Sequence, residues 1–258
     1  MIWFLTAAGV ILFLWWALFL LVHRWPRKPV DERPDWGTCT DTFLPAIDGG
    51  YLEVWRVTSG GAKNGSSKGG HAKGVVVLAH GWSRNRGRMV RRARLFGKLG
   101  YTTVLHSARD HGASSKHPLM NAVHFCEDIE AVLDWVGEPV LLYGHSAGSA
   151  GAILAAHRRK EQVKALFMEA SYADTETALM SLYRWVHPLF GKCCGPIIIG
   201  TLRLLYGRDN LRQCSPEVLA KDLDMPVMLI HGAKDRRFPL IFAQQLKTAF
   251  RNGNAEMF

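Results

Sequence analysis

The chain has 258 residues, 48% of them hydrophobic, which is enough to bury a large core in a single α/β domain. Its formal net charge of +10 indicates an anionic neighbour, either a nucleic acid or a membrane surface. The sequence has neither zinc-finger spacing nor an aromatic RNA-binding motif, which disfavours nucleic acid. The five cysteines are odd in number and irregularly spaced, so a disulfide framework is disfavoured and a reducing compartment is indicated.

Residues 2–22 form an uncharged stretch rich in Leu, Phe and Trp. At a rise of about 1.5 Å per residue, such a helix is long enough to cross a hydrocarbon core of about 30 Å. A cleaved signal peptide is the alternative, but this sequence has neither the basic start nor the small-residue cleavage site expected of a signal peptide. Basic residues follow the stretch, and the positive-inside rule then places the C-terminal domain in the cytoplasm. The sequence thus predicts a single-pass transmembrane anchor over residues 1–23 and a linker over residues 24–39.

From residue 40 to residue 258, short apolar runs alternate with segments of helical periodicity. The expected strands are residues 40–47, 51–57, 74–79, 102–106, 139–143, 163–169 and 226–230. The expected helices are residues 89–99, 121–136, 147–160 and 240–250. The first two strands are expected to form a hairpin, and residues 58–74 are expected to form an exposed loop rich in Gly and Ser. Strands separated by helices of this length predict a mostly parallel sheet that helices cover on both faces.

A G-x-S-x-G sequence, Gly144-His145-Ser146-Ala147-Gly148, lies between an expected strand and a run of small residues. Between a strand and a helix, this sequence predicts a nucleophile elbow, a sharp turn that lifts a serine hydroxyl above the edge of a sheet. The two glycines suit a turn in which a Cβ would collide with neighbouring backbone. The helix that follows would direct its N-terminal amides at the reaction centre, where they stabilise negative charge. The alternative is an ordinary glycine-rich turn with an incidental serine, but the flanking segments favour the elbow.

Three further segments occur in a characteristic order around the elbow. His80-Gly81-Trp82 follows an expected strand, residues 109–114 read Arg-Asp-His-Gly-Ala-Ser, and residues 231–235 read His-Gly-Ala-Lys-Asp. With the elbow, these segments make residues 40–258 resemble the α/β-hydrolase superfamily, especially its single-domain serine esterase and lipase-like members. The resemblance implies the α/β-hydrolase fold, a mostly parallel central sheet flanked by helices. Asp110 departs from the family pattern, which has glycine at that place.

The resemblance also implies a role for each site residue. Ser146 is the nucleophile, and Asp235 is the acid that orients the base and stabilises its charged form. The backbone N–H groups of Trp82 and Ala147 form the oxyanion hole. Asp174 is a second candidate for the acid, and the alternative interpretation of Asp235 is a solvated loop aspartate. No metal or organic cofactor is implied.

The histidine base is missing from its expected place. The family order is serine, acid, histidine, but no histidine follows Asp235, and all eleven histidines of the chain lie earlier. His106, His111 and His117 fall on a loop near the expected site, but none has the expected topology, so no base is nominated. The last residues resemble the start of a final strand. Either the chain is a truncated form of a longer enzyme, or the protein lacks the base.

Two features bear on the substrate. Residues 174–222 lie in the position of a helical cap, and their apolar stretch 179–206 is either the core of packed cap helices or a roof that binds an acyl chain. Just after the His-Gly segment, six arginines occur close together: Arg84, Arg86, Arg88, Arg91, Arg92 and Arg94. A solvated basic face is the default interpretation of this run. The alternative is a patch that rests on anionic lipid or receives an anionic head group.

Together these features predict a membrane-anchored serine hydrolase that cleaves a small-molecule or lipid ester through an acyl-serine. An acyltransferase that uses the same acyl-serine is a second enzyme hypothesis. A third hypothesis, from a different class, is a membrane-bound adaptor that kept the fold and lost the base.

Overall fold

The computed structural model describes residues 2–23, 29, 32–58 and 72–258. Part of the linker expected over residues 24–39 lies outside these ranges, as does most of the loop expected over residues 58–74. A three-residue strand ends the described chain, so the interpretation of its last residues as the start of a strand is confirmed.

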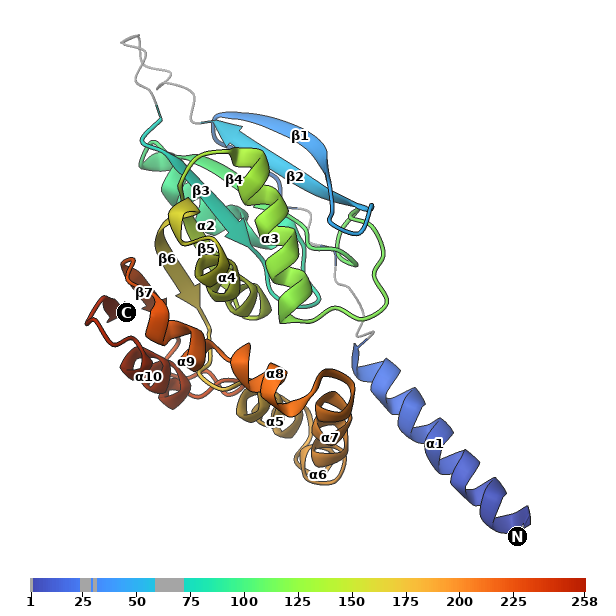
Figure 1. Ribbon diagram of the computed structural model, residues 1–258. Coiled ribbons are helices and arrows are strands. Elements are labelled where there is room, and N and C mark those ends of the chain that lie inside the picture. The colour runs from blue at the N-terminus through green and yellow to red at the C-terminus, as the bar shows by residue number, and fades with distance from the viewer. Residues whose placement is uncertain (1, 24–28, 30–31, 59–71) are drawn as a thin grey trace.

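An eight-stranded sheet forms the centre of the described chain, in the order β1-β2-β4-β3-β5-β6-β7-β8 (Figure 1). Its strands are β1 Thr38–Pro45, β2 Tyr51–Thr58, β3 Val75–Ala79, β4 Thr102–His106, β5 Val140–His145, β6 Val163–Glu169, β7 Val227–Ile230 and β8 Ala255–Met257. β2 runs antiparallel to both β1 and β4, whereas every other neighbouring pair is parallel. The prediction of a mostly parallel sheet is therefore confirmed.

Helices cover both faces of the sheet, with α3 and α4 in front of it in Figure 1. The helices are α1 Ile2–His23, α2 Val90–Lys98, α3 Ala122–Val136, α4 Ala147–Arg158, α5 Thr175–Val186, α6 Pro188–Cys193, α7 Gly195–Tyr206, α8 Arg208–Gln213, α9 Pro216–Leu219 and α10 Leu240–Ala249. Side chains of a strand alternate between its faces. In β3, Val75, Val77 and Ala79 therefore pack in the same core as α3 and α4, while Val76 and Leu78 pack with α2. This two-sided burial explains why β3 is a continuous apolar run.

A helical insertion, α5 to α8, separates β6 from β7 and lies beside the sheet (Figure 1). It has an apolar core of its own, built around Tyr183, Ile198 and Leu202. The insertion falls within the stretch that the sequence indicates as a cap.

The N-terminal helix α1 requires a correction. Its extent agrees with the apolar run in the sequence, but no helix among the described residues is long and apolar enough to cross a membrane. The predicted transmembrane anchor over residues 1–23, and with it the single-pass membrane localisation with a cytoplasmic catalytic domain, is therefore wrong. The physical difference lies near the C-terminal end of α1, since elsewhere in the helix Leu12 and Phe13 stay 63% and 70% exposed. Phe19 is only 1% exposed and packs with Tyr183 and Ile198 of the insertion instead of facing lipid.

The loop after β4 is held by Arg109, a fully buried arginine. Its guanidinium forms ion pairs with Asp128 at 2.6 Å and Asp48 at 2.9 Å, and also with Glu127. The backbone N–H of Arg109 donates to Asp128 as well, at 2.7 Å. This network ties the loop to α3 and to the β1–β2 turn, because a buried charge must be paired to be tolerated. The resemblance of residues 109–114 to a family motif therefore has a structural basis.

Arg109→Met is expected to lower the free energy of unfolding by about 3–5 kcal/mol, because it leaves the buried carboxylate of Asp128 without its cation. Urea denaturation followed by circular dichroism measures the change. Arg158→Met is the matched control, since the Arg158 side chain is 40% exposed and pairs with Glu130 at 3.3 Å. Such a surface pair contributes about 0–1 kcal/mol. Equal losses in the two variants would contradict the proposed role of the buried network.

Candidate functional site

Ser146 occupies a sharp turn between β5 and α4, with φ 54° and ψ −119°. Residues other than glycine rarely adopt a positive φ, and such a conformation costs about 1–3 kcal/mol. The surrounding packing holds it in place. A Cβ added at Gly144 would lie 2.5 Å from the carbonyl oxygen of Gly148, and one added at Gly148 would lie 2.4 Å from that of His80. The geometry expected of a nucleophile elbow is therefore present, for the steric reason that the sequence indicated.

The His-Gly segment after β3 lies directly against this turn. A Cβ added at Gly81 would be 3.0 Å from both the Ser146 Cβ and the His145 Nδ1. Trp82 is the next residue, so its backbone is brought beside the elbow. Ala147 is the first residue of α4, and an N–H at that position has no acceptor within its own helix. The structure thus brings together Ser146, Trp82 and Ala147; an oxyanion hole at the two N–H groups stays a prediction.

Two histidines fix the His-Gly segment to the loop after β4. The N–H of Ala108 donates to His80 Nε2 at 3.0 Å, and the N–H of Ser83 donates to His111 Nε2 at 3.1 Å. Since each Nε2 accepts, each Nδ1 carries the proton and donates to a backbone carbonyl, at 2.7 Å for His80 and 2.8 Å for His111. Both rings therefore position backbone at the site rather than act as a base.

Other histidines near the site are also poor candidates for a base. His106 is fully buried, and burial lowers its pKa to about 3. Burial likewise lowers the pKa of His145 to about 4. Neither ring lines the cavity into which Ser146 opens, and among the described residues no histidine does.

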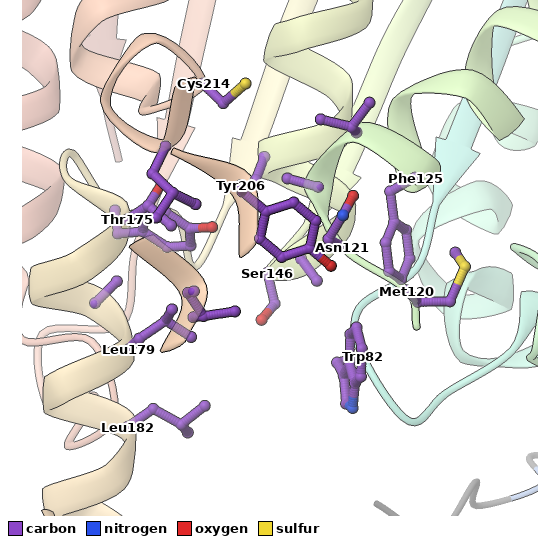
Figure 2. A pocket seen from close by; sticks show the side chains of 18 of the residues that line it. Trp82, Met120, Asn121, Phe125, Ser146, Thr175, Leu179, Leu182, Tyr206 and Cys214 are labelled. Atoms are coloured by element: carbon purple, nitrogen blue, oxygen red, sulfur yellow. The ribbon is translucent and has the colours of Figure 1, made fainter. Parts of the chain in front are cut away.

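That cavity has a volume of about 510 Å³ and lies between the sheet's carboxyl edge and the helical insertion (Figure 2). Trp82, Ser146 and Ala147 line it from the elbow side, and aliphatic and aromatic side chains line most of the remainder. These include Met120, Phe125, Ala178, Leu179, Leu182, Tyr183, Leu202 and Phe238. Figure 2 shows the Ser146 side chain directed into the space between Leu179 and Trp82. The insertion has the packed apolar core that the sequence suggested, and some of the same side chains line the cavity. Binding of an acyl chain by this roof stays a prediction.

Asp235 lies in the turn after β7 and is not among the residues that line the cavity. Its carboxylate accepts from the N–H groups of Arg237 at 2.7 Å and Phe238 at 3.1 Å, and Phe238 does line the cavity. Asp174, the second candidate acid, caps α5 by accepting from the Thr177 N–H at 2.8 Å. The capping role explains Asp174 without any catalytic function.

Sequence reasoning missed Glu169, the last residue of β6. Its carbonyl oxygen accepts the N–H of Ser146 at 2.9 Å, so it supports the elbow directly. Its carboxylate pairs with Arg92 and accepts from the Tyr143 hydroxyl at 2.7 Å. Burial acts to raise the pKa of Glu169, but the hydrogen bond from Arg92, with smaller contributions from other neighbours, outweighs it and holds the pKa below its usual range. The sequence placed Glu169 at the end of an expected strand, but that position alone does not single out a glutamate as a functional residue. Across the described ranges, no three His, Cys, Asp or Glu side chains are grouped to hold a metal ion.

The sheet order, the elbow and the helical insertion define an α/β-hydrolase. The sequence model of the family described as serine aminopeptidase, S33, matches residues 70–204, more than half of the chain. The chain belongs to this family.

The sequence identity between the chain and individual relatives is low. The chain is 24% identical to a monoacylglycerol lipase of Mycolicibacterium smegmatis over 206 residues, which cover 65% of the chain and 72% of the lipase. It is 25% identical to the human protein ABHD12B over 193 residues, which cover 69% of the chain but only 50% of that protein.

Solved structures show the same fold. The esterase Pf2001 of Pyrococcus furiosus superimposes with a TM-score of 0.65 at 17% identity, covering 90% of this chain and 87% of the esterase. Mouse α/β-hydrolase domain-containing protein 10 gives a TM-score of 0.61 at 20% identity, covering 85% and 88%. At these identities the likeness concerns the fold alone.

Gly148→Ala is expected to lower the free energy of unfolding by about 1–3 kcal/mol, because the new Cβ forces β3 and α4 apart. Thermal or urea denaturation measures the effect. Gly200→Ala in α7 is the control, since a Cβ there meets nothing within 4 Å. That variant should be unchanged or more stable by up to about 1 kcal/mol. Unaltered stability of the Gly148→Ala protein would mean that the packing at the elbow is looser than described.

Proposed function

We propose that the chain is a serine hydrolase that cleaves esters of apolar acyl chains through an acyl-enzyme at Ser146. The observation that carries the proposal is the position of this serine, on a strained turn that opens into a largely apolar cavity of about 510 Å³. Ligand pockets in proteins commonly combine such an apolar lining with a few polar groups. The relatives named as a lipase and an esterase are consistent with this substrate class.

In this proposal the Ser146 Oγ attacks the carbonyl carbon of the ester while its proton passes to a base. The backbone N–H groups of Trp82 and Ala147 donate to the oxyanion of the tetrahedral intermediate. The bond between the acyl carbon and the alcohol oxygen then breaks, and the alcohol leaves with a proton. Water adds to the acyl-serine and releases the acid, which regenerates the Ser146 hydroxyl.

Asp235 is proposed as the acid that orients the base. Its turn follows β7, and β7 is separated from β5 by β6 alone, so the two strand ends lie about 10 Å apart. A bridging imidazole fits between groups at this separation. No histidine of the described chain lines the cavity, so the base is assigned to no residue.

The domain organisation belongs to the same proposal. Residues 40–258 would form the hydrolase domain, and residues 174–222 would form its cap. The apolar side chains that the cap directs at the cavity would then contact the acyl chain, while the elbow and the His-Gly segment contact the ester group.

Ser146→Ala is expected to abolish labelling by a fluorophosphonate and to reduce kcat/KM for a p-nitrophenyl ester by at least about 10³-fold, because the attacking oxygen is removed. Gel fluorescence and ester hydrolysis measure the two effects. Ser149→Ala is the control, since Ser149 lies in α4, the helix that follows Ser146, is 0% exposed and has an Oγ without a hydrogen-bond partner among the described residues. Labelling that survives Ser146→Ala would overturn the assignment of the nucleophile.

Ala178→Phe is expected to discriminate between acyl chains. Ala178 is 2% exposed and lines the cavity, so a phenyl ring there occupies space that a long chain requires. The value of kcat/KM for a dodecanoate ester should fall about tenfold or more, while that for an acetate ester changes little. Leu204→Phe, at an 81% exposed position of α7, should affect neither ester. An equal fall for both esters would indicate that the acyl chain lies elsewhere.

A further inference from the structure

The six arginines between residues 84 and 94 divide into two groups in the folded chain. Four of them form ion pairs with carboxylates, so their positive charge is neutralised within the fold. The pairs are Arg86 with Asp41 and Glu53, Arg91 with Glu32, Arg92 with Glu169, and Arg94 with Asp35. Arg84 and Arg88 form no ion pair with any residue that the structure describes. The free positive charge of this run is therefore concentrated in two residues.

A third arginine without a carboxylate partner in the described chain, Arg237, comes from the turn after β7. Its guanidinium lies over the ring of Trp185 in α5, 4.3 Å from the centroid. The Ser181 hydroxyl of the same helix donates to the Arg237 carbonyl oxygen at 2.7 Å. These contacts hold Arg237 where the turn meets the insertion, immediately before the cavity residue Phe238.

Each of the three arginines lies next to a segment that forms the elbow or its cavity. Arg84 lies two residues after Trp82, and Arg237 immediately precedes Phe238; both Trp82 and Phe238 line the cavity. The carbonyl oxygen of Arg88 accepts from the Arg92 guanidinium at 3.3 Å, and Arg92 pairs with Glu169, whose carbonyl oxygen accepts the N–H of Ser146. Burial is the main cause of the lowered pKa of His145, and the charges of arginines that include Arg88 and Arg237 lower it further. Burial also lowers the pKa of Arg88, as do arginines that include Arg84. Arg88 and Arg237 therefore lie within electrostatic range of His145, the residue that precedes the candidate nucleophile, and Arg84 lies within electrostatic range of Arg88.

Glu169 is the carboxylate that acts on His145 in the opposite sense, and it is already engaged. Arg92 pairs with it and the Tyr143 hydroxyl donates to it. Its charge also acts on Arg88 and opposes the lowering of the Arg88 pKa, but Glu169 forms no ion pair with Arg84, Arg88 or Arg237. Arg88 and Arg237 are exposed to solvent, so an incoming anion can reach them.

We infer that Arg84, Arg88 and Arg237 form an anion subsite beside Ser146 that takes a phosphate or carboxylate group carried by the substrate ester. The inference rests on the proposed function and specifies its substrate class: an ester with an apolar acyl chain in the cavity and a negative charge on the alcohol side. Arginine suits this task because its planar guanidinium donates two parallel hydrogen bonds to a phosphate or carboxylate. Fields from clustered like charges also concentrate anions at the mouth of a cleft.

The first experiment compares two esters with the same acyl chain, a monoacylglycerol and the matching acylglycerol phosphate. The phosphate-bearing ester should have a kcat/KM at least about tenfold higher, mostly through a lower KM, and the preference should shrink as salt is raised. The double variant Arg88→Gln/Arg237→Gln should bring the ratio of the two kcat/KM values close to one. Arg91→Gln is the matched control: its side chain is 79% exposed and pairs with Glu32, so the ratio should not change. A ratio that is unaffected in the double variant overturns the subsite.

The second experiment measures binding without turnover, so that it separates the subsite from the hydrolysis. Ser146→Ala protein is titrated calorimetrically with an alkylglycerol phosphate ether, with the neutral alkylglycerol ether and with inorganic phosphate. Tighter binding of the phosphate ether than of the other two supports the subsite, even if no ester is hydrolysed and the proposed function fails. Equal binding of the two ethers overturns the subsite while leaving the hydrolase proposal intact. Inorganic phosphate that binds as tightly as the phosphate ether shows a site for free anion and overturns the substrate assignment.

Discussion

At the carboxyl edge of the sheet, the end of β3, the end of β5 and the first turn of α4 approach so closely that no side chain fits between them. Gly144, Gly148 and Gly81 occupy the contact points. Their missing Cβ atoms let the backbone close around Ser146 and hold it at a positive φ that an isolated serine would avoid. The direction of the Ser146 side chain, the entrance to the cavity and the placing of the His-Gly segment all depend on this contact.

Polar groups then fix the loops that this contact brings together. His80 and His111 use both ring nitrogens to connect the His-Gly segment to the loop after β4. Arg109 anchors that loop through buried ion pairs, and Glu169 supports the elbow through its backbone and binds Arg92 through its side chain. Charged groups inside a fold need partners, and here the partners come from distant strands and helices. These contacts connect the loops where a reacting group would have to be positioned.

The helical insertion gives the site its second wall. Its helices bury Tyr183 and Leu202 in a small core, and the same residues line the cavity, so one set of apolar side chains serves folding and the pocket together. Phe19 of α1 joins this core. An apolar run in a sequence does not show where its side chains go: Phe19 packs on protein, whereas Leu12 and Phe13 of the same helix are exposed. The transmembrane interpretation of residues 2–22 was wrong, since no described helix is long and apolar enough to cross a membrane.

The sequence by itself determined the order of strands and helices, most of their boundaries and the elbow at Ser146. These features depend on side-chain periodicity and on glycines close together in the chain, which are local properties. Only the tertiary structure decided which of the six arginines are neutralised, that His106 is buried, and that Glu169 supports the elbow. Each of these outcomes depends on contacts between segments far apart in the sequence, and such contacts leave no periodic pattern along the chain.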